Sequence, residues 1–262
     1  MTSEAMMTTV HDPAEALSAL GLRADKEALR ALLTHATKSQ WSPAQLCLEL
    51  AVLEKRERDA RNLAARTKSA TLGSVKPLDH FDWTHPRALD RDLYDDLHAT
   101  LGFIERGENV LLRGQAGVGK TTLAKHLGLA ALARGHSVRF STLAGALADL
   151  LRCETLPAVE RRLRRYTAPE LLILDELGYV PCDASAADLL FRIISQRHEH
   201  RAIVITTNLA YKQWGTLFGD APCLGALVDR FAQHCHVFDI DADSWRDKER
   251  LEKKGLSPRP RR

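Results

Sequence analysis

One stretch of the sequence has the residue types and spacing needed to surround the phosphates of a nucleotide. Residues 114–121, which we call the phosphate loop, follow the pattern G-x-x-x-x-G-K-T, and a second threonine comes next. Glycines in such a loop let backbone N–H groups turn toward phosphate oxygens, the lysine adds positive charge, and the threonine hydroxyl is a ligand for Mg²⁺. The sequence therefore predicts a site for ATP and Mg²⁺ made of Gly114, Gln115, Ala116, Gly117, Val118, Gly119, Lys120, Thr121 and Thr122.

Two acidic residues, Asp175 and Glu176, directly follow an apolar segment further along the chain. Ligands of parallel sheets bind at the carboxyl ends of the strands. We therefore expect Asp175 to hold Mg²⁺ and Glu176 to polarise the water that attacks the γ-phosphate. Asn208 ends a second apolar segment and is expected to hydrogen-bond that water or a γ-phosphate oxygen. Helix or turn capping would also explain these residues, but the phosphate loop favours catalysis.

Two arginines toward the C-terminus could act on the same phosphate. Arg230 lies near the expected end of one helix, and Arg246 lies at the expected start of another. A guanidinium group stabilises the charge that spreads over the γ-phosphate during transfer, and it can come from the same chain or from a neighbouring subunit. The spacing alone is equally compatible with two surface arginines in salt bridges.

The elements that must position these residues alternate between short apolar runs and helical stretches. This alternation predicts an α/β fold with a parallel sheet and flanking helices. Runs such as LLIL and AIVI are typical of strands that are buried on both faces. The candidate strands are Val110–Arg113, Val138–Phe140, Leu171–Leu174, Ile203–Thr206 and Val237–Ile240.

The N-terminal part of the chain has a different, helical pattern. Asp12 with Pro13 and Ser42 with Pro43 are typical helix starts, and leucines recur at helical spacing after them. A linker follows at residues 73–77. We therefore expect three parts: a helical N-terminal domain with its linker at residues 1–75, an ATPase domain at 76–250, and a basic tail at 251–262.

Composition narrows the function classes further. Charged residues make up 27% of the chain and no apolar run reaches about 18 residues, so no membrane segment is predicted. The N-terminus does not resemble a secretory signal, which indicates a cytoplasmic location. The cysteines are scattered, and we expect His234, Cys235 and His236 to pack rather than to bind a metal. Basic clusters at 54–66, 161–165 and 246–262 could contact DNA phosphates, although solvated helix faces explain them as well.

Five segments in order, GQAGVGKTTLA, LLILDELGYVP, VITTNLAYKQW, LVDRFAQHCHVFDI and DSWRDKE, together resemble the IstB family. These AAA+ ATPases assist the transposition of IS21-type insertion sequences and are related to the DnaC helicase loaders. The resemblance implies that Asn208 is sensor 1, that Arg230 is an arginine finger across a subunit interface and that Arg246 is sensor 2. It also implies ATP-assembled homo-oligomers on duplex DNA, and an N-terminal domain that contacts a cognate transposase or a partner subunit.

Other functions share parts of this pattern. A DnaC-like helicase loader would have the same fold but would act with single-stranded DNA and a helicase. A small-molecule P-loop kinase would need an acceptor pocket and an arginine-bearing lid, and the sequence shows neither clearly. A nucleotide-switched DNA scaffold that hydrolyses ATP poorly is disfavoured by the presence of Glu176.

Overall fold

The computed structural model describes residues 12–178, 183–219, 221–245, 248 and 250. The chain divides into two compact units, residues 1–65 and residues 66–262.

The first unit is helical, as its sequence predicts. It contains α1 (Pro13–Ala19), α2 (Lys26–Lys38) and the first part of α3 (Pro43–Ala70). Asp12 caps α1 by accepting a hydrogen bond from the backbone N–H of Ala14, which confirms the predicted start. The core of this unit is small, and its central cluster of buried hydrophobic residues is Ala14, Ala24 and Leu29.

A buried carboxylate ties the elements of the first unit together. Glu54 of α3 is only 8% exposed and accepts hydrogen bonds from the backbone N–H groups of Arg23 and Ala24, both at 2.7 Å. The guanidinium of Arg61, about two turns further along α3, lies 3.3 Å from the same carboxylate. A buried carboxylate is tolerated when its oxygens are paired in this way.

The second unit contains a five-stranded parallel sheet with the strand order β2-β3-β4-β1-β5. All five predicted strands are present, and each is longer than the predicted run by two or three residues. Their bounds are β1 (Asn109–Gly114), β2 (Val138–Thr142), β3 (Leu171–Leu177), β4 (Ala202–Thr207) and β5 (Cys235–Ile240). The central strands β3 and β4 are almost fully buried, as expected for strands covered on both faces.

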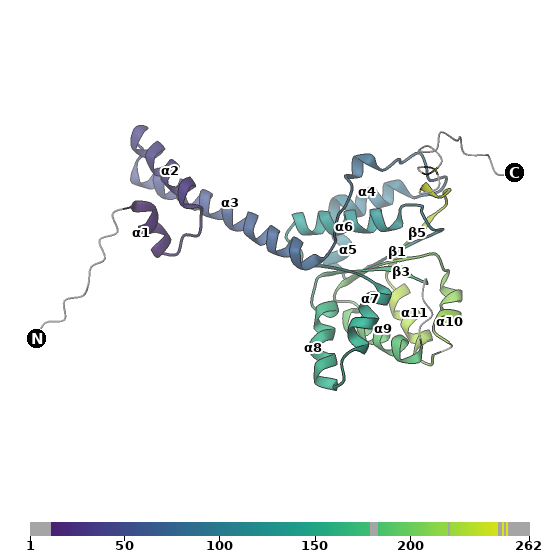
Figure 1. Ribbon diagram of the computed structural model, residues 1–262. Helices are drawn as coiled ribbons and strands as arrows, with labels where there is room; N and C mark the ends of the chain where they lie inside the picture. Colours follow the sequence, from purple (N-terminus) through teal and green to yellow (C-terminus); the bar gives the residue numbers. More distant parts are fainter. Residues whose placement is uncertain (1–11, 179–182, 220, 246–247, 249, 251–262) are drawn as a thin grey trace, which may run out of the picture. The chain divides into compact units, whose positions relative to one another are not determined.

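Helices cover both faces of this sheet (Figure 1). One layer contains α4 (Arg91–Thr100), α5 (Gly102–Glu105) and α6 (Lys120–Ala133). The opposite layer contains α7 (Leu143–Leu151), α8 (Leu156–Thr167), α9 (Ala184–Arg197), α10 (Trp214–Leu217) and α11 (Leu224–Ala232). Alternate residues of a strand enter different cores: Val110 and Leu112 pack in the first layer, and Leu111 packs in the second. Short 3-10 turns occupy Leu78–His80 and Tyr211–Gln213.

The segment between α3 and α4 runs along the sheet edge toward the phosphate loop. The hydroxyl of Thr71 donates to the carbonyl of Phe140 in the edge strand β2 at 2.6 Å, and Leu72 is buried in the core. The side chain of Leu72 lies close to Gly128 of α6. Further along, the carbonyl of Lys76 lies 2.8 Å from Nε2 of His126, also on α6. These contacts fix the residues after position 70 against the helix that follows the phosphate loop.

At the end of the sheet opposite the phosphate loop, the side chain of Arg197 is fully buried, and within the described part of the chain no carboxylate pairs with it. Its guanidinium donates hydrogen bonds to backbone carbonyls, the shortest to Ala202 at the start of β4 (2.6 Å) and to Pro169 before β3 (2.7 Å). It also contacts the carbonyls of Tyr166 at 2.9 Å and Glu170 at 3.0 Å. Arg197 therefore ties the end of α8 to the amino-terminal ends of β3 and β4.

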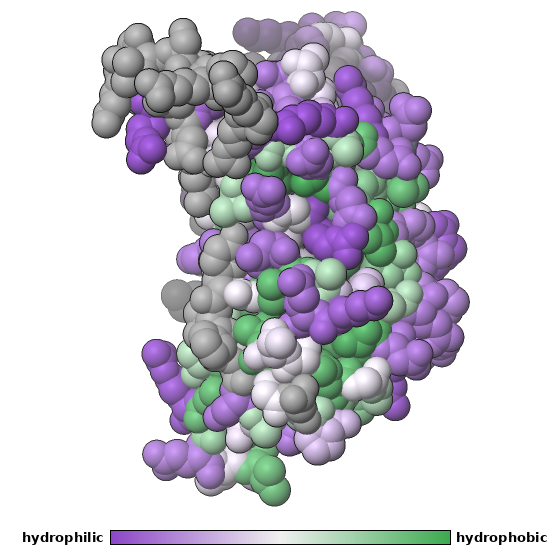
Figure 2. Space-filling model, turned by 90° about the vertical axis from the view of Figure 1, so that its right-hand side faces the viewer, coloured by the Kyte–Doolittle hydropathy of each residue, from purple (hydrophilic) through white to green (hydrophobic). Residues whose placement is uncertain are grey.

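Among the described residues, none of the helices is both long enough and apolar enough to cross a membrane. The face drawn in Figure 2 mixes hydrophilic side chains with smaller hydrophobic areas that reach the surface between them.

Candidate functional site

The loop between β1 and α6 has the backbone conformation that its glycines were expected to allow. Gly117 and Gly119 have φ angles of +84° and +94°, which side chains other than glycine rarely adopt. Gly119 also has no room for a side chain, because an added Cβ would lie 2.6 Å from Cε2 of Phe81. Helix α6 begins at Lys120 immediately after this turn. A helix N-terminus that follows such a loop presents N–H groups and a partial positive charge, which favours anions.

Lys120 is held inside this loop. Its side chain is mostly buried, and Nζ donates hydrogen bonds to the carbonyl oxygens of Gly114 at 2.6 Å and Gln115 at 2.7 Å. The ammonium group thus lies over the loop and next to the cavity described below, where it can attract an anion.

The acidic residues at the end of β3 lie directly beside the loop. Asp175 is 3% exposed, and the hydroxyl of Thr121 lies 2.9 Å from its Oδ1 and 3.1 Å from its Oδ2. On the other side, the hydroxyl of Thr206 in β4 donates to Oδ1 at 2.5 Å. The structure therefore brings a carboxylate and two hydroxyl groups together at the carboxyl ends of neighbouring strands.

Glu176 differs from its neighbour in both exposure and backbone conformation. Its φ angle is +64°, and the ladder between β3 and β4 is irregular between Leu174 and Leu177. A non-glycine residue in this left-handed region costs about 1–2 kcal/mol. The bulge leaves Glu176 exposed between the buried residues Asp175 and Leu177. The strain therefore accompanies a conformation that directs this side chain out of the sheet.

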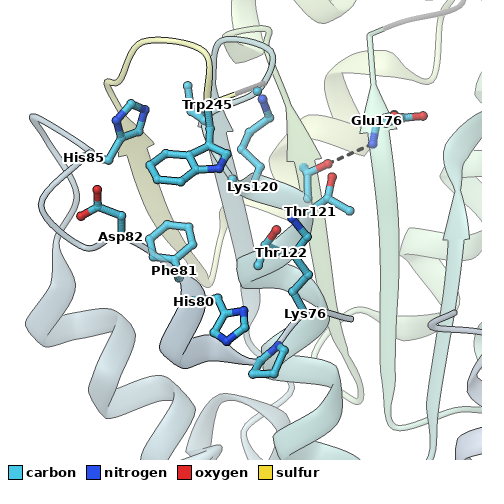
Figure 3. Close-up of a pocket in the computed structure, with 15 residues that line it drawn as sticks. Lys76, His80, Phe81, Asp82, His85, Lys120, Thr121, Thr122, Glu176 and Trp245 are labelled. Carbon is cyan, nitrogen blue, oxygen red and sulfur yellow. Dashed lines mark hydrogen bonds between the residues drawn. The ribbon is translucent and has the colours of Figure 1, made fainter. Parts of the chain in front are cut away.

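A cavity of about 670 Å³ lies beside these groups, although Asp175 is not among the residues that line it (Figure 3). Its lining includes Gly117–Thr122 of the loop and α6, together with Glu176 and Thr206. Figure 3 shows the aromatic side chains of Phe81 and Trp245 on one side of the cavity and Glu176 on the other. The remaining lining residues come mostly from the segment before α4: Lys76, Pro77, His80, Asp82 and His85.

The aromatic side of the cavity is held by contacts between two distant parts of the sequence. The ring of His85 packs edge-on against Trp245, with the ring centroids 4.9 Å apart, and its Nε2 lies 2.8 Å from the carbonyl of Asp243. Hydrogen bonds from Thr84 and the ammonium of Lys248 hold the pKa of Asp82 below its ordinary value. Asp82 is therefore charged near neutral pH.

Comparison with known proteins agrees with these features. The profile of a family described as IstB-like ATP binding protein matches residues 15–253. The chain belongs to this family. One relative, a protein of insertion sequence IS21 from Pseudomonas aeruginosa that is named for ATP binding, is 38% identical over 223 residues, which cover 85% of this chain and 83% of the relative. Another, from insertion sequence IS5376 of Geobacillus stearothermophilus, is 34% identical over 220 residues, covering 84% and 87%.

The fold of this IstB-like ATP-binding protein is also found among solved structures. The crystal structure of DnaI matches with a TM-score of 0.50 and 18% identity, covering 57% of this chain and 82% of DnaI. At this identity the match concerns the fold alone, and it supports the predicted AAA+-like α/β architecture. The resemblance to the IstB family inferred from the sequence is confirmed.

The structure does not bring every predicted site residue of this IstB-like protein to the cavity. Asn208 is exposed just beyond β4 and lies beside Gly178 rather than in the cavity lining. Arg230 lies on α11, where it donates a hydrogen bond to the hydroxyl of Ser195 at 2.6 Å and packs over the ring of Phe191. Arg246 lies outside the described residues.

Several lining residues were not expected from the sequence. Those at positions 76–85 lie at the end of the predicted linker or just after it, in a stretch for which the sequence predicts no site residue. Thr206 was predicted only as the last residue of a strand. A signal was present for Thr206, because a polar residue that ends an otherwise apolar strand lies at the edge of the sheet where ligands bind.

Proposed function

We propose that this IstB-like protein hydrolyses ATP with Mg²⁺ and uses that reaction to control its assembly on duplex DNA next to a transposase. The observation that carries the proposal is the arrangement at the carboxyl ends of β3 and β4. A buried carboxylate, Asp175, is hydrogen-bonded to the first threonine of α6, and an exposed carboxylate, Glu176, lines the same cavity as the phosphate loop.

The residues present suit Mg²⁺. The hydroxyl of Thr121 and the carboxylate of Asp175 offer hard oxygen ligands that are already 2.9 Å apart. Mg²⁺ is commonly held by one or two carboxylates together with substrate phosphates. The described residues contain no cluster of three or more His, Cys, Asp or Glu side chains that could bind a metal by themselves. When bound with ATP, Mg²⁺ would neutralise charge on the β- and γ-phosphates.

Each remaining role belongs to a group of the chain itself. The loop N–H groups and Lys120 bind the phosphates, and the Glu176 carboxylate accepts a proton from the attacking water. Asn208 orients that water or a γ-phosphate oxygen, and Arg246 acts on the γ-phosphate from the same chain. The rings of Phe81 and Trp245 lie on the side of the cavity away from Glu176, where they would hold the nucleobase.

Assembly of several copies is part of the proposal. Arg230 belongs to α11 and is not among the residues that line the cavity of its own chain. In this proposal it reaches the γ-phosphate bound by a neighbouring copy, so hydrolysis depends on a homo-oligomer formed with ATP. Arginines supplied in this way raise the rate of phosphoryl transfer by about 10³–10⁵-fold.

Contact with DNA and with a transposase is supported by the relatives, whose names refer to insertion sequences. The basic cluster of α8 offers DNA contacts: Arg161 and Arg164 are exposed, whereas Arg162 and Arg165 pair with Asp149. In the proposal, the helical N-terminal part and linker, residues 1–75, contact the transposase or a partner subunit. There α3 carries two exposed hydrophobic residues one turn apart, Leu48 and Val52.

One experiment tests the main claim. ATP hydrolysis and binding to labelled duplex and single-stranded DNA are measured at fixed salt for the wild type and for Glu176→Gln. The wild type is expected to hydrolyse ATP and to bind duplex DNA only with ATP. The variant is expected to bind ATP with wild-type affinity, to hydrolyse it about 10²–10⁴-fold more slowly, and to stay on DNA.

Other results would point elsewhere. Wild-type turnover in the variant would remove Glu176 from the reaction. A clear preference for single-stranded DNA would favour a helicase loader, and ATP binding without measurable hydrolysis by the wild type would favour a nucleotide-switched scaffold. Because electrostatic binding to DNA weakens as salt rises, every comparison is made at one ionic strength.

A further inference from the structure

One hydroxyl group, that of Thr206, contacts both acidic residues of the site. It donates its proton to Oδ1 of Asp175 at 2.5 Å and accepts a hydrogen bond from the backbone N–H of Glu176 at 2.9 Å. The side chain is 1% exposed, yet it lines the cavity. A threonine hydroxyl has one proton to donate and lone pairs to accept, so its position is fixed by two partners that belong to adjacent residues of β3.

The bulge in β3 explains why the backbone N–H of Glu176 needs a side chain as its hydrogen-bond acceptor. Leu174 pairs with Ile205 and Leu177 pairs with Thr207, so two residues of β3 stand opposite the single residue Thr206. An extra residue of this kind loses its regular ladder partner. The N–H of Glu176 is instead satisfied by the Thr206 hydroxyl, which holds the backbone of Glu176 in its left-handed conformation.

The backbone of Thr206 also pairs with β1, the strand on the side of β4 away from β3. Its neighbour across the sheet is Leu112 of β1, the strand that leads into the phosphate loop. Thr121, the first threonine of α6, shares the Asp175 carboxylate with Thr206. The Thr206 hydroxyl therefore lies at the centre of a short chain of contacts that joins the loop, through Thr121 and the Asp175 carboxylate, to the backbone of Glu176.

We propose that Thr206 is a positioning residue for ATP hydrolysis, whose hydroxyl sets the orientation of Asp175 and Glu176 relative to each other. This inference rests on the proposed ATPase function. Thr206 acts through the two carboxylates and does not itself take part in proton transfer. Loss of its hydroxyl leaves the Glu176 N–H without its acceptor and Asp175 without one donor, so both carboxylates can turn away from their working positions.

The test uses the full chain with three substitutions. Thr206→Val keeps the shape of the side chain and removes the hydroxyl, and Thr206→Ser keeps the hydroxyl. Thr207→Val is the matched control, because Thr207 is also buried in β4, and its hydroxyl donates to the Leu177 carbonyl without being in the cavity lining. Circular dichroism and thermal melting verify folding, and Thr206→Ala replaces Thr206→Val if the latter does not fold.

Thr206→Val is expected to lower kcat for ATP by about 10- to 100-fold while the Kd for ATP without Mg²⁺ stays within about twofold of the wild type. It is also expected to weaken the gain in ATP affinity that Mg²⁺ produces, because Asp175 is less well oriented. Thr206→Ser should restore most of the rate, and Thr207→Val should keep a kcat near that of the wild type. A purely structural role would affect the two valine variants alike and would not separate kcat from ATP affinity.

Two outcomes contradict the inference in distinguishable ways. If the wild type hydrolyses ATP and Thr206→Val matches it in kcat and in the effect of Mg²⁺, Thr206 positions nothing and the ATPase proposal stands. If the wild type shows no hydrolysis, the ATPase proposal fails first. The gain in ATP affinity that Mg²⁺ produces then still tests whether Thr206 orients Asp175. If this gain is the same in Thr206→Val as in the wild type, the role of Thr206 in orienting Asp175 is overturned as well.

Discussion

The phosphate loop allows a specific test of how tightly it is fixed, the substitution Gly119→Ala. The φ angle of +94° at this position is strained for alanine, and the new Cβ would lie 2.6 Å from Cε2 of Phe81. Carbon atoms in contact are normally about 3.5–4.0 Å apart. Either the ring or the loop must therefore move by about 1 Å.

The expected size of the effect has two parts. Alanine in the left-handed region costs about 1–2 kcal/mol, which lowers the melting temperature by about 2–8 °C for a unit of this size. Displacement of the loop also removes or weakens N–H contacts to phosphate. Hydrogen bonds to charged groups are worth about 1.5–3 kcal/mol each, so loss of one weakens ATP binding by about 10- to 100-fold.

Gly135→Ala provides the matched control. Gly135 follows α6, has a φ angle of +97°, and has no other atom within 4 Å of an added Cβ. It should lower the melting temperature through backbone strain alone and leave ATP affinity unchanged. Titration with a fluorescent ATP analogue and thermal melting are measured for both variants.

Wild-type ATP affinity in Gly119→Ala would contradict this prediction, because the loop would then tolerate the displacement that the Phe81 contact demands. An equal loss of ATP affinity in Gly135→Ala would contradict it as well. The effect would then come from general loss of stability rather than from the phosphate loop.

Two further predictions concern a subunit contact and a surface ion pair. Arg230→Ala is expected to keep its affinity for ATP and to lose most of its ATP hydrolysis. If the arginine acts across an interface between copies, mixing this variant with Glu176→Gln should restore some hydrolysis. Full hydrolysis by a monomeric Arg230→Ala protein would refute the role of Arg230 between copies. The Arg106 guanidinium beside Glu108, with further help from His236, lowers the pKa of Glu108 to about 2. Because this folded-state pKa lies below the ordinary value of 4.5, the pair stabilises the protein above about pH 4.5 and loses that contribution as the pH falls toward 2. The difference in melting temperature between the wild type and Glu108→Gln should shrink over that range, and a constant difference would show that the ion pair does not contribute.

Much of the fold could be predicted because its signals are local. A short apolar run is typical of a strand that is buried on both faces. All five strands of the sheet are therefore predicted from the sequence, with errors only at their ends. The starts at Pro13 and Pro43 were also local, since a capping residue followed by proline favours only a helix start. The phosphate loop and the Asp-Glu pair combine such local signals in the right order.

The rest of the site depends on contacts between residues far apart in the chain. Nothing near Phe81 in the sequence indicates that its ring will press against Gly119. The bulge at Glu176 depends on pairing with β4, and the role of Thr206 depends on that bulge. Asn208 has the residue type expected for sensor 1, but the register of β4 places the buried hydroxyl of Thr206, two residues earlier, next to the Asp175 carboxylate and the Glu176 backbone N–H.

The buried side chain of Arg197 has a mechanical consequence for this site. It joins the amino-terminal ends of β3 and β4 through their carbonyls, at the end of the sheet opposite the cavity. A planar guanidinium with several fixed donors permits little relative motion of the groups that it bridges. With their bases clamped, the two strands cannot slide past each other when the cavity fills. A response to a ligand in the cavity is therefore expected at the carboxyl ends of β3 and β4, where Glu176 and Thr206 line it.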